Sequence, residues 1–406
     1  MKNLLTIGLS LFCFSVFAQY DCSSGRYKTR NFFAGFDKTL AVEFGENTAA
    51  NGSGPQKLYM DVFEPTGDSE TKRPAVIMAF GGTFINGDRT QVHPIAEELA
   101  KMGYVAVAVD YRIPVQPPFD KVEWTLAVMR GMHDIKAAVR YFYKDAKTNG
   151  NVFGVDTNNI FIGGASSGAI SALHAAYFDK QSEVPSYMLN DTTGLGGPEG
   201  HSGNAGYSSD VAGVINYSGA IGDTLWIENN DIPIVSIHDD QDPTVPYDTR
   251  EIAPNGFKTG LTTSGSRDIT ARCENTGTKN DLHTVLNSTG HVSYVVDDFD
   301  FTIEFTADFL SSLFCDAPSS IAENSSYPSF EVYPNPAKNQ FTINFQNILG
   351  KESKVEMLNL TGQIVRTQKI TSDQSVTIDK ESLSPGIYFI RLTNDGASTT
   401  RKVTLL

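Results

Sequence analysis

The sequence predicts an α/β fold, with a mostly parallel sheet flanked by helices, followed by a small C-terminal all-β sandwich. Between residues 26 and 314, short and almost wholly apolar β-like runs alternate with amphipathic runs, which is typical of strands buried on both faces of a parallel sheet. After Cys315 a run of Ser, Ala, Asn and Pro interrupts this order, and short alternating strands follow. We therefore expect one domain over residues 19–315, a linker over 316–328 and a second domain over 329–406.

The N-terminal segment predicts export. Lys2 precedes an apolar run that leads to small residues ending at Ala18, the pattern of a cleavable signal peptide over residues 1–18. A transmembrane anchor is the alternative, but the apolar run is shorter than the ~20 residues that a span needs. No later segment is apolar over that length, so we expect no membrane span in the mature protein.

The overall charge disfavours one class of partner. The formal net charge of the chain is −15, and a surface that acidic repels phosphate backbones and anionic lipid. We therefore expect no nucleic-acid partner.

The individual elements follow from the apolar pattern. The β-like runs of the first domain cover residues 57–63, 75–80, 104–109, 160–162, 211–217, 234–238 and 283–286. Amphipathic helices are predicted over residues 94–102, 126–143, 167–177 and 301–314. Two Gly/Pro-rich segments, 112–123 and 185–210, are long enough to build a binding face or lid, with an ordinary solvated loop as the alternative.

A pair of glycines follows the early β-run that ends at Phe80. Gly81 and Gly82 leave backbone N–H groups free, and together with Thr83 they are candidates for an oxyanion hole. A tight glycine turn without catalytic meaning is the alternative reading.

The most informative stretch lies between a β-run and a helix. The five residues that begin at Gly164 and end at Gly168 fit the pattern G-x-S-x-G, in which a strained turn exposes a serine hydroxyl above the sheet. Ser166 stands at the centre and is the candidate nucleophile, while Ser167 is expected to add its backbone N–H to the oxyanion hole. A helix N-cap serine in a glycine-rich turn is the alternative.

A catalytic serine needs an acid and a base. The buried run 234–238 delivers Asp239, Asp240 and Asp242. We choose Asp242 because it lies in the loop, which Pro243 and Pro246 would stiffen; a solvated acidic turn is the alternative. His291 follows Gly290 in a loop and is the candidate base. The competing His283 begins a β-run and is expected to be structural.

Three cysteines remain after the predicted cleavage. Cys22, Cys273 and Cys315 allow one disulfide and one free thiol in an exported protein. The sequence leaves the pairing open.

These motifs resemble the α/β-hydrolase superfamily and, within it, the secreted carboxylesterases. The chain order Ser166, Asp242, His291 is that of α/β-hydrolases, FGGTFINGDR is similar to their oxyanion loop, and HDDQDPTVPY to their acid loop. The chain departs from the family pattern at Phe80, Thr83 and Asp239, none of which belongs to the triad.

The resemblance implies ester hydrolysis through an acyl-enzyme without metal or organic cofactor. A serine peptidase and a non-catalytic binding protein of the same fold are the alternatives.

Export suggests a substrate that is esterified to a polymer, such as an acetylated polysaccharide or a polyester. Phe80, Phe84, Tyr111, Phe119 and Trp124 lie on loops near the predicted oxyanion hole and would suit an aromatic acyl group such as feruloyl. The alternative is that they are ordinary core and loop aromatics.

The C-terminal region resembles a second family. VYPNP, LNLTGQIV, LSPGIYFIRL and the terminal RKVTLL are similar to the type A C-terminal sorting domain of the bacterial type IX secretion system. The resemblance implies that the secretion machinery is a partner, that the protein is secreted or lies at the cell surface, and that the tail is removed or anchored. From the strand pattern alone, a carbohydrate-binding or adhesion sandwich is the alternative.

Overall fold

The computed structural model describes residues 20–114, 120–188, 196–315, 329–335, 337–346, 353–359, 362–370, 375–380, 383–394 and 397–406. The predicted signal peptide, the predicted linker and Phe119 lie outside the described residues. The chain divides into two compact units, one up to Asp316 and one from Ala317. Each unit is described by itself.

The described part of the first unit is built on an eight-stranded sheet with the order β1-β2-β4-β3-β5-β6-β8-β11. Its strands are β1 (Phe36–Thr48), β2 (Pro55–Pro65), β3 (Arg73–Ala79), β4 (Val105–Val109), β5 (Val155–Ala165), β6 (Gly213–Tyr217), β8 (Ile234–Asp239) and β11 (Asn280–Val285). β1 and β2 run antiparallel to their neighbours, and all pairs from β4 to β11 are parallel. The predicted α/β fold with a mostly parallel sheet is confirmed.

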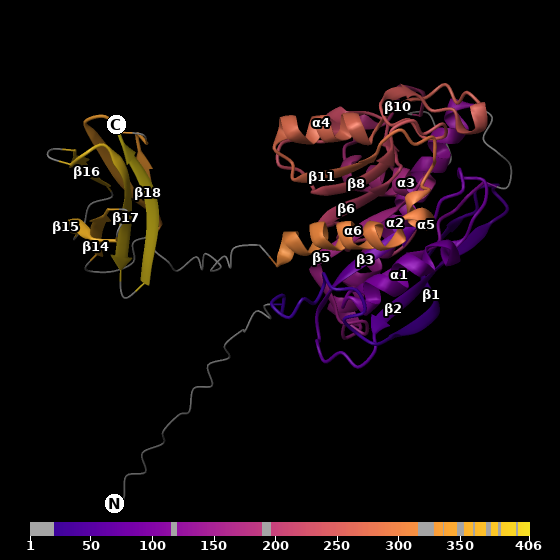
Figure 1. Cartoon of the computed structure of the whole chain (residues 1–406), viewed down its shortest axis with the longest axis horizontal. Helices are drawn as coiled ribbons and strands as arrows, with labels where there is room; N and C mark the ends of the chain where they lie inside the picture. Colours follow the sequence, from indigo (N-terminus) through magenta and orange to yellow (C-terminus); the bar gives the residue numbers. More distant parts are fainter. Residues whose placement is uncertain are drawn as a thin grey trace, which may run out of the picture. The chain divides into compact units, whose positions relative to one another are not determined.

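Helices cover both faces of this sheet (Figure 1). α1 (His93–Lys101) and α6 (Phe299–Phe314) pack together on one face, and α2 (Lys121–Thr148) and α3 (Ser167–Tyr177) pack together on the other. Because parallel strands end at the same edge of a sheet, the loops after β3, β5, β8 and β11 all leave the sheet at one edge. That edge carries the candidate site.

Several elements escaped the sequence analysis. They are β1, β7 (Ala220–Ile221), β9 (Thr249–Glu251), β10 (Thr262–Gly265), α4 (Ser266–Thr276) and α5 (Tyr294–Asp297). β1 is an edge strand with mostly exposed side chains, so it lacks an apolar run. The buried face of α4 is made of Ser266, Ile269, Cys273 and Thr276, which do not form an apolar stripe.

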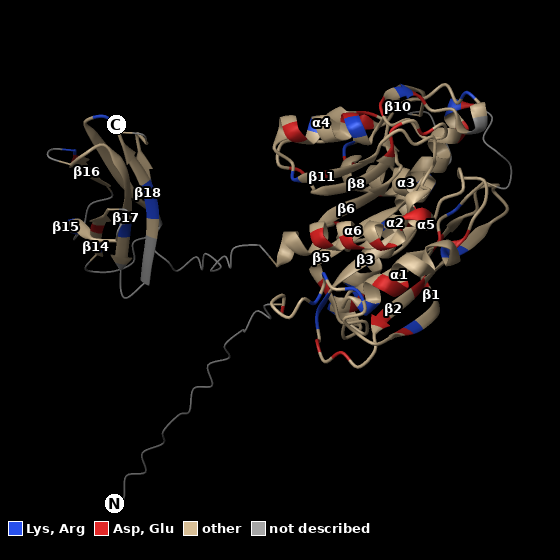
Figure 2. Cartoon of the chain, in the orientation of Figure 1, with Lys and Arg blue, Asp and Glu red and all other residues tan. Residues whose placement is uncertain are grey.

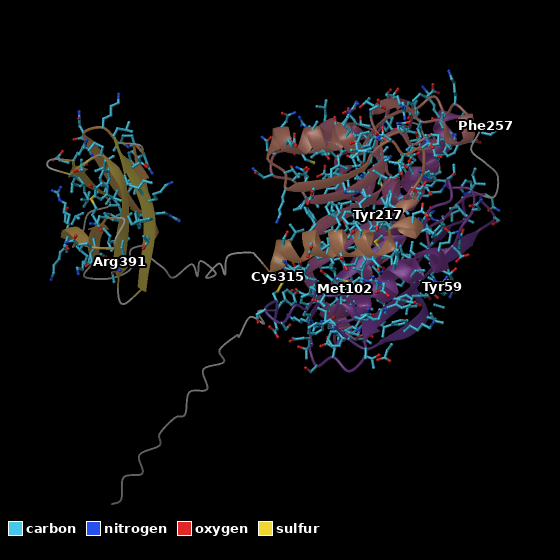
Figure 3. All side chains as sticks on the ribbon, in the orientation of Figure 1. Tyr59, Met102, Tyr217, Phe257, Cys315 and Arg391 are labelled. Carbon is cyan, nitrogen blue, oxygen red and sulfur yellow. A yellow bond between two sulfur atoms is a disulfide. The ribbon has the colours of Figure 1, made fainter. Side chains whose placement is uncertain are left out.

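The interior of the first unit follows from the apolar runs. All seven residues of β3 are buried, and Tyr217 at the end of β6 lies deep among the strands (Figure 3) with no exposed side-chain surface. The outer surface carries charges of both signs, with acidic side chains along α1, α4 and α6 (Figure 2). Within the described residues, no helix combines the length and apolar character that crossing a bilayer requires.

A disulfide joins the two ends of the first unit. Cys22 pairs with Cys315, which lies at the end of α6 (Figure 3), and the two are 293 positions apart in sequence. Cys273 is a buried free thiol, and burial raises its pKa to about 12. The pairing that the sequence left open is therefore Cys22–Cys315.

We predict that replacing both bonded cysteines by serine lowers the free energy of unfolding by up to about 5 kcal/mol, because the bond restricts a very long loop in the unfolded chain. Urea unfolding of the full chain measures the change. Cys273→Ser is the matched control and should shift the free energy by only about 1 kcal/mol. Equal unfolding midpoints for the wild type and the double variant would contradict the prediction.

The second unit is an all-β structure with two antiparallel sheets in its described part. One sheet has the order β12-β13-β16 and the other the order β15-β14-β17-β18. The strands are β12 (Ser329–Tyr333), β13 (Gln340–Gln346), β14 (Ser353–Leu358), β15 (Ile364–Ile370), β16 (Ser375–Asp379), β17 (Gly386–Asn394) and β18 (Ala397–Leu405). Phe341, Ile343, Ile390 and Val403 are fully buried between them, which confirms the predicted small all-β unit.

Candidate active site

Ser166 occupies a sharp turn between β5 and α3. Its backbone angles, φ 53° and ψ −119°, lie in a strained region that side-chain-bearing residues rarely adopt. A Cβ added at Gly164 would lie 2.5 Å from the backbone of Gly168, and one added at Gly168 would lie 2.3 Å from the carbonyl oxygen of Ala79. Only glycine fits at both positions, so the glycines allow the turn that presents the serine.

The predicted triad residues form one hydrogen-bonded chain. His291 Nε2 lies 2.8 Å from Ser166 Oγ, and His291 Nδ1 lies 2.7 Å from Asp242 Oδ2. The carboxylate can only accept, so Nδ1 carries the ring proton and donates it to Asp242. Nε2 is then free to accept the proton of the Ser166 hydroxyl, which is the arrangement a general base requires.

Asp242 is held in its charged form. Burial would raise the pKa of its carboxyl, but hydrogen bonds from His238 and His291 and from the Thr244 amide outweigh burial and lower the pKa to about 2. Its Oδ1 accepts from the amides of Thr244 and Val245 at 2.7 and 3.0 Å. The carboxylate can therefore orient His291 and stabilise its cationic form.

His238 is a neighbour of the triad to which the sequence analysis assigned no role. Its Nε2 faces a carbonyl and a carboxylate oxygen, which only accept, so Nε2 carries the ring proton. Nδ1 lies 2.8 Å from Ser266 Oγ and accepts the proton of that hydroxyl, which in turn accepts a hydrogen bond from Asn216. The Nε2 proton then points at the Val245 carbonyl oxygen and at Asp242 Oδ2, 3.2 and 3.4 Å away. The spacing of four residues between His238 and Asp242 is the one sequence signal for this contact.

We predict that the Asp242 carboxylate stabilises the fold in a defined pH window. Its pKa falls from an ordinary 3.8 to about 2 on folding, so the unfolded chain binds this proton more readily than the folded chain. The contribution, roughly 2 kcal/mol, is present above about pH 4 and is lost as the pH falls through about 2. Urea unfolding of the wild type and Asp242→Asn between pH 5 and pH 2.5 measures it. The difference in the free energy of unfolding between the wild type and Asp242→Asn should decrease toward low pH. A difference that stays constant would contradict the lowered pKa of Asp242.

Asp239 and Asp240 hold the segment that carries His291. Asp239 Oδ1 accepts hydrogen bonds from the hydroxyls of Ser288 and Ser293, at 2.5 and 3.4 Å, and Asp240 Oδ1 accepts from the Ser288 amide at 3.0 Å. Ser288 and Ser293 flank His291 in sequence. Asp239 and Asp240 therefore position the loop, whereas the imidazole itself contacts Asp242.

The competing histidine lies elsewhere. His283 is on β11, and its ring packs against Phe301 and Phe305 of α6, with centroids 4.4 and 5.9 Å apart. It contacts the core and is not hydrogen-bonded to Ser166, whose ring partner is His291.

The predicted oxyanion residues surround Ser166. A Cβ at Gly81 would lie 3.3 Å from Ser166 Cβ, and Gly82 and Thr83 have positive φ angles of 130° and 56°. Among the described residues, the amides of Gly82 and Thr83 have no hydrogen-bond partner. Ser167 is the first residue of α3, so its amide has no carbonyl partner within the helix. The geometry leaves these N–H groups available for a developing negative charge.

Of the five aromatics predicted to bind substrate, Phe119 lies outside the described residues, and two others lie in the core instead. Phe80 and Tyr111 stack with ring centroids 4.3 Å apart and are almost fully buried. The Tyr111 hydroxyl donates to the Phe80 carbonyl oxygen and lies 3.0 Å from Ser167 Oγ. They support the oxyanion loop against the turn at Ser166, because the chain after β3 passes directly over the start of α3.

Phe84 and Trp124 do line a pocket that reaches Ser166. The pocket has a volume of about 210 Å³, and its surface is mostly apolar. Its walls come from α2, from one face of α3, and from the segments that flank β7, β9 and β10; representative apolar residues are Met129, Met132, Ile170, Phe178, Trp226 and Leu261. His174 of α3 also lines it. These segments lie far apart in sequence, so only the helical spacing of Ile170 and His174 after Ser166 could have indicated the pocket.

Two family models match separate parts of the chain. The BD-FAE family, an esterase-like α/β-hydrolase domain, matches residues 60–222, and the secretion system C-terminal sorting domain matches residues 331–405. Among curated proteins, ulvan lyase NLR42 of Nonlabens ulvanivorans is 25% identical over 193 residues, which are 46% of this chain and 29% of that protein. The match therefore spans less than a third of that relative.

Solved structures with a similar fold include two forms of Thermogutta terrifontis esterase 2. The form phosphorylated by paraoxon is 18% identical, with a TM-score of 0.51, and the match covers 70% of this chain and 96% of that one. The form phosphoramylated by tabun is also 18% identical, with a TM-score of 0.51, and the match covers 70% and 97%. At this identity the likeness establishes the fold of the first unit.

Proposed function

We propose that this protein, which carries an α/β-hydrolase domain and a type IX secretion sorting domain, is a serine esterase that hydrolyses carboxylic esters through an acyl-enzyme. The sorting domain directs it to the cell surface or the extracellular space. The observation that carries the proposal is the hydrogen-bonded chain from Ser166 through His291 to Asp242. Such a chain raises the nucleophilicity of a serine hydroxyl at neutral pH.

Acylation follows from the contacts of these groups. His291 Nε2 takes the proton of Ser166 as the oxygen attacks the ester carbonyl carbon, and the carbonyl oxygen becomes an oxyanion that the amides of Gly82 and Ser167 bind. The tetrahedral species collapses, the C–O bond to the alcohol breaks, and His291 gives its proton to the departing alkoxide. Asp242 stabilises the imidazolium between the two transfers.

Deacylation repeats the sequence with water. His291 Nε2 accepts a proton from water, the hydroxyl oxygen attacks the acyl carbon, and the bond to Ser166 Oγ breaks. The proton returns to Ser166, and the free acid leaves. These steps use only this chain's side chains and amides together with water.

The substrate class follows from the pocket and from export. A pocket of about 210 Å³ is smaller than the usual site for a drug-sized ligand, so it suits one acyl group and excludes a polymer. The alcohol part of the ester can then be the polymer, which remains outside the pocket. The apolar walls with Phe84 and Trp124 favour an aryl acyl group such as feruloyl over an acetyl group, which would leave most of the pocket empty.

The test compares esters with amides and long acyl groups with short ones. We expect release of p-nitrophenol from acyl esters, no measurable release of p-nitroaniline from peptide anilides, and faster hydrolysis of methyl cinnamate than of methyl acetate. A fluorophosphonate probe should label Ser166. Preferential anilide cleavage would identify a peptidase instead, and absence of both labelling and hydrolysis would identify a binding protein.

A further inference from the structure

The pocket beside Ser166 has one polar end. Its walls are mostly apolar, but His174 and Thr263 add a ring nitrogen and a hydroxyl to its lining. Neither atom takes part in the triad or the oxyanion hole. An apolar pocket with a few converging polar groups uses those groups to select the orientation and identity of its ligand.

His174 lies on the face of α3 that follows the pocket away from Ser166. His174 is the eighth residue of α3, so its backbone lies eight positions after that of Ser166, a rise of about 12 Å along the helix. Its Nδ1 lies 2.8 Å from the Ile170 carbonyl oxygen, and because a carbonyl only accepts, Nδ1 carries the proton. Nε2 is therefore an acceptor with a free lone pair, and it has no hydrogen-bond partner in the part of the chain that the structure describes.

The position of Nε2 is fixed by its neighbours. A Cβ added at Gly222, another pocket residue, would lie 3.4 Å from His174 Nε2 and 2.7 Å from the Trp226 ring. The His174 and Trp226 rings meet edge to face with centroids 5.4 Å apart. Burial lowers the pKa of His174 to about 4, so the ring is neutral and keeps its acceptor at neutral pH.

Thr263 is the second, independent observation. Its hydroxyl oxygen is buried and lacks a hydrogen-bond partner among the described residues, although the residue lines the pocket. The antiparallel register of β7 and β10 pairs Ser264 with Ile221. Continued by one position, this register brings Thr263 opposite Gly222, whose added Cβ would lie 3.4 Å from His174 Nε2. A buried hydroxyl without a partner costs stability, which a ligand hydroxyl at this position would recover.

We propose that His174 and Thr263 form a recognition site for a hydroxyl group on the acyl part of the ester. The ligand hydroxyl donates to His174 Nε2, and its oxygen accepts from the Thr263 hydroxyl. The acyl groups that this site selects are para-hydroxylated aryl acids, such as 4-hydroxycinnamates. The inference rests on the proposed esterase function, because it needs the reacting carbonyl to lie at Ser166.

The spacing of Ser166 and His174 along the chain agrees with this class of acid. An extended 4-hydroxycinnamoyl group places its hydroxyl oxygen roughly 8 Å from the carbonyl carbon, by ordinary bond lengths. With the bond to Ser166 at one end and a hydrogen bond to Nε2 at the other, the total is on the scale of the rise of about 12 Å between the backbones of Ser166 and His174. An acetyl group ends far short of His174, and an unhydroxylated cinnamoyl group leaves both polar atoms without a partner.

The experiment measures kcat/KM for methyl 4-hydroxycinnamate and methyl cinnamate with the full chain. We expect the wild type to prefer the hydroxylated ester by about tenfold or more, since two hydrogen bonds are gained. His174→Leu and Thr263→Val should each reduce this ratio, His174→Leu to about one. The matched controls His174→Gln and Thr263→Ser keep an acceptor and a hydroxyl, and each should preserve at least part of the preference.

The outcomes separate this inference from the proposed function. If the wild type hydrolyses both esters equally, or if Thr263→Val and His174→Leu leave the ratio of the wild type intact, the recognition site is wrong while the esterase function stands. If neither ester is hydrolysed and Ser166 is not labelled by a fluorophosphonate, the proposed function itself fails. Because Thr263→Val is nearly isosteric, it remains informative even if His174→Leu does not fold.

Discussion

Ser166→Ala is expected to lower kcat for ester hydrolysis by about 10⁴- to 10⁶-fold. The hydroxyl oxygen is the atom that bonds to the acyl group, and alanine offers no replacement nucleophile. Residual turnover should come only from the oxyanion amides and the pocket. Initial rates with p-nitrophenyl esters measure the loss, and circular dichroism with thermal unfolding checks that the variant folds.

The adjacent serine provides a matched control. The Ser167 hydroxyl is hydrogen-bonded to Tyr111, and only its backbone amide is proposed to bind the oxyanion. Ser167→Ala should therefore lose less than about tenfold in kcat. If Ser167→Ala lost more activity than Ser166→Ala, the nucleophile would be Ser167 instead. A Ser166→Ala variant that retains most of its activity would end the acyl-enzyme proposal.

His291→Gln is expected to cause a loss of similar size, about 10⁴- to 10⁶-fold in kcat. Glutamine cannot accept the Ser166 proton and return it to the leaving alcohol, so both half-reactions slow. Because Ser166 and His291 act as one unit, the double variant should be little slower than either single variant. Single-turnover kinetics with p-nitrophenyl esters measure all three.

His283→Gln is the control for a histidine substitution. Its ring packs on Phe301 and Phe305, so kcat should change by less than about threefold, with only a modest decrease in stability. Additive losses in the double variant, or a larger loss at His283 than at His291, would contradict the proposed base.

Much of the fold could be predicted because buried parallel strands have a strong local signal. β3, β4 and β8 are fully buried, and β3 and β4 are almost wholly apolar. α3 has the bounds that the glycine-rich turn and the helical pattern predict. β1 and α4 could not be predicted in this way. β1 gains its place from pairing with β2 at a sheet edge, and α4 buries small polar side chains, so neither leaves a periodic apolar pattern.

The triad of the candidate site could likewise be predicted from local sequence signals, whereas the pocket could not. Ser166, Asp242 and His291 each follow a buried strand, and the sheet brings them together at its edge, so motif and chain order were sufficient to choose them. Their catalytic roles remain predictions. The pocket could not be predicted from the sequence, because its walls come from helices and strands that lie far apart in the chain. In addition, Phe80 and Tyr111 were predicted to line it but pack beneath the oxyanion loop.

The Cys22–Cys315 bond also has a consequence for maturation. Cys315 is the last described residue of the first unit, so a protease that cuts between Cys315 and the sorting domain, which begins near residue 331, removes that domain and leaves the disulfide intact. The disulfide forms in an oxidising compartment. It also needs Cys315, which is synthesised near the end of this unit. The disulfide can therefore form only after nearly the whole of the first unit has been synthesised and exported. It stabilises the folded domain and does not direct the early steps of folding.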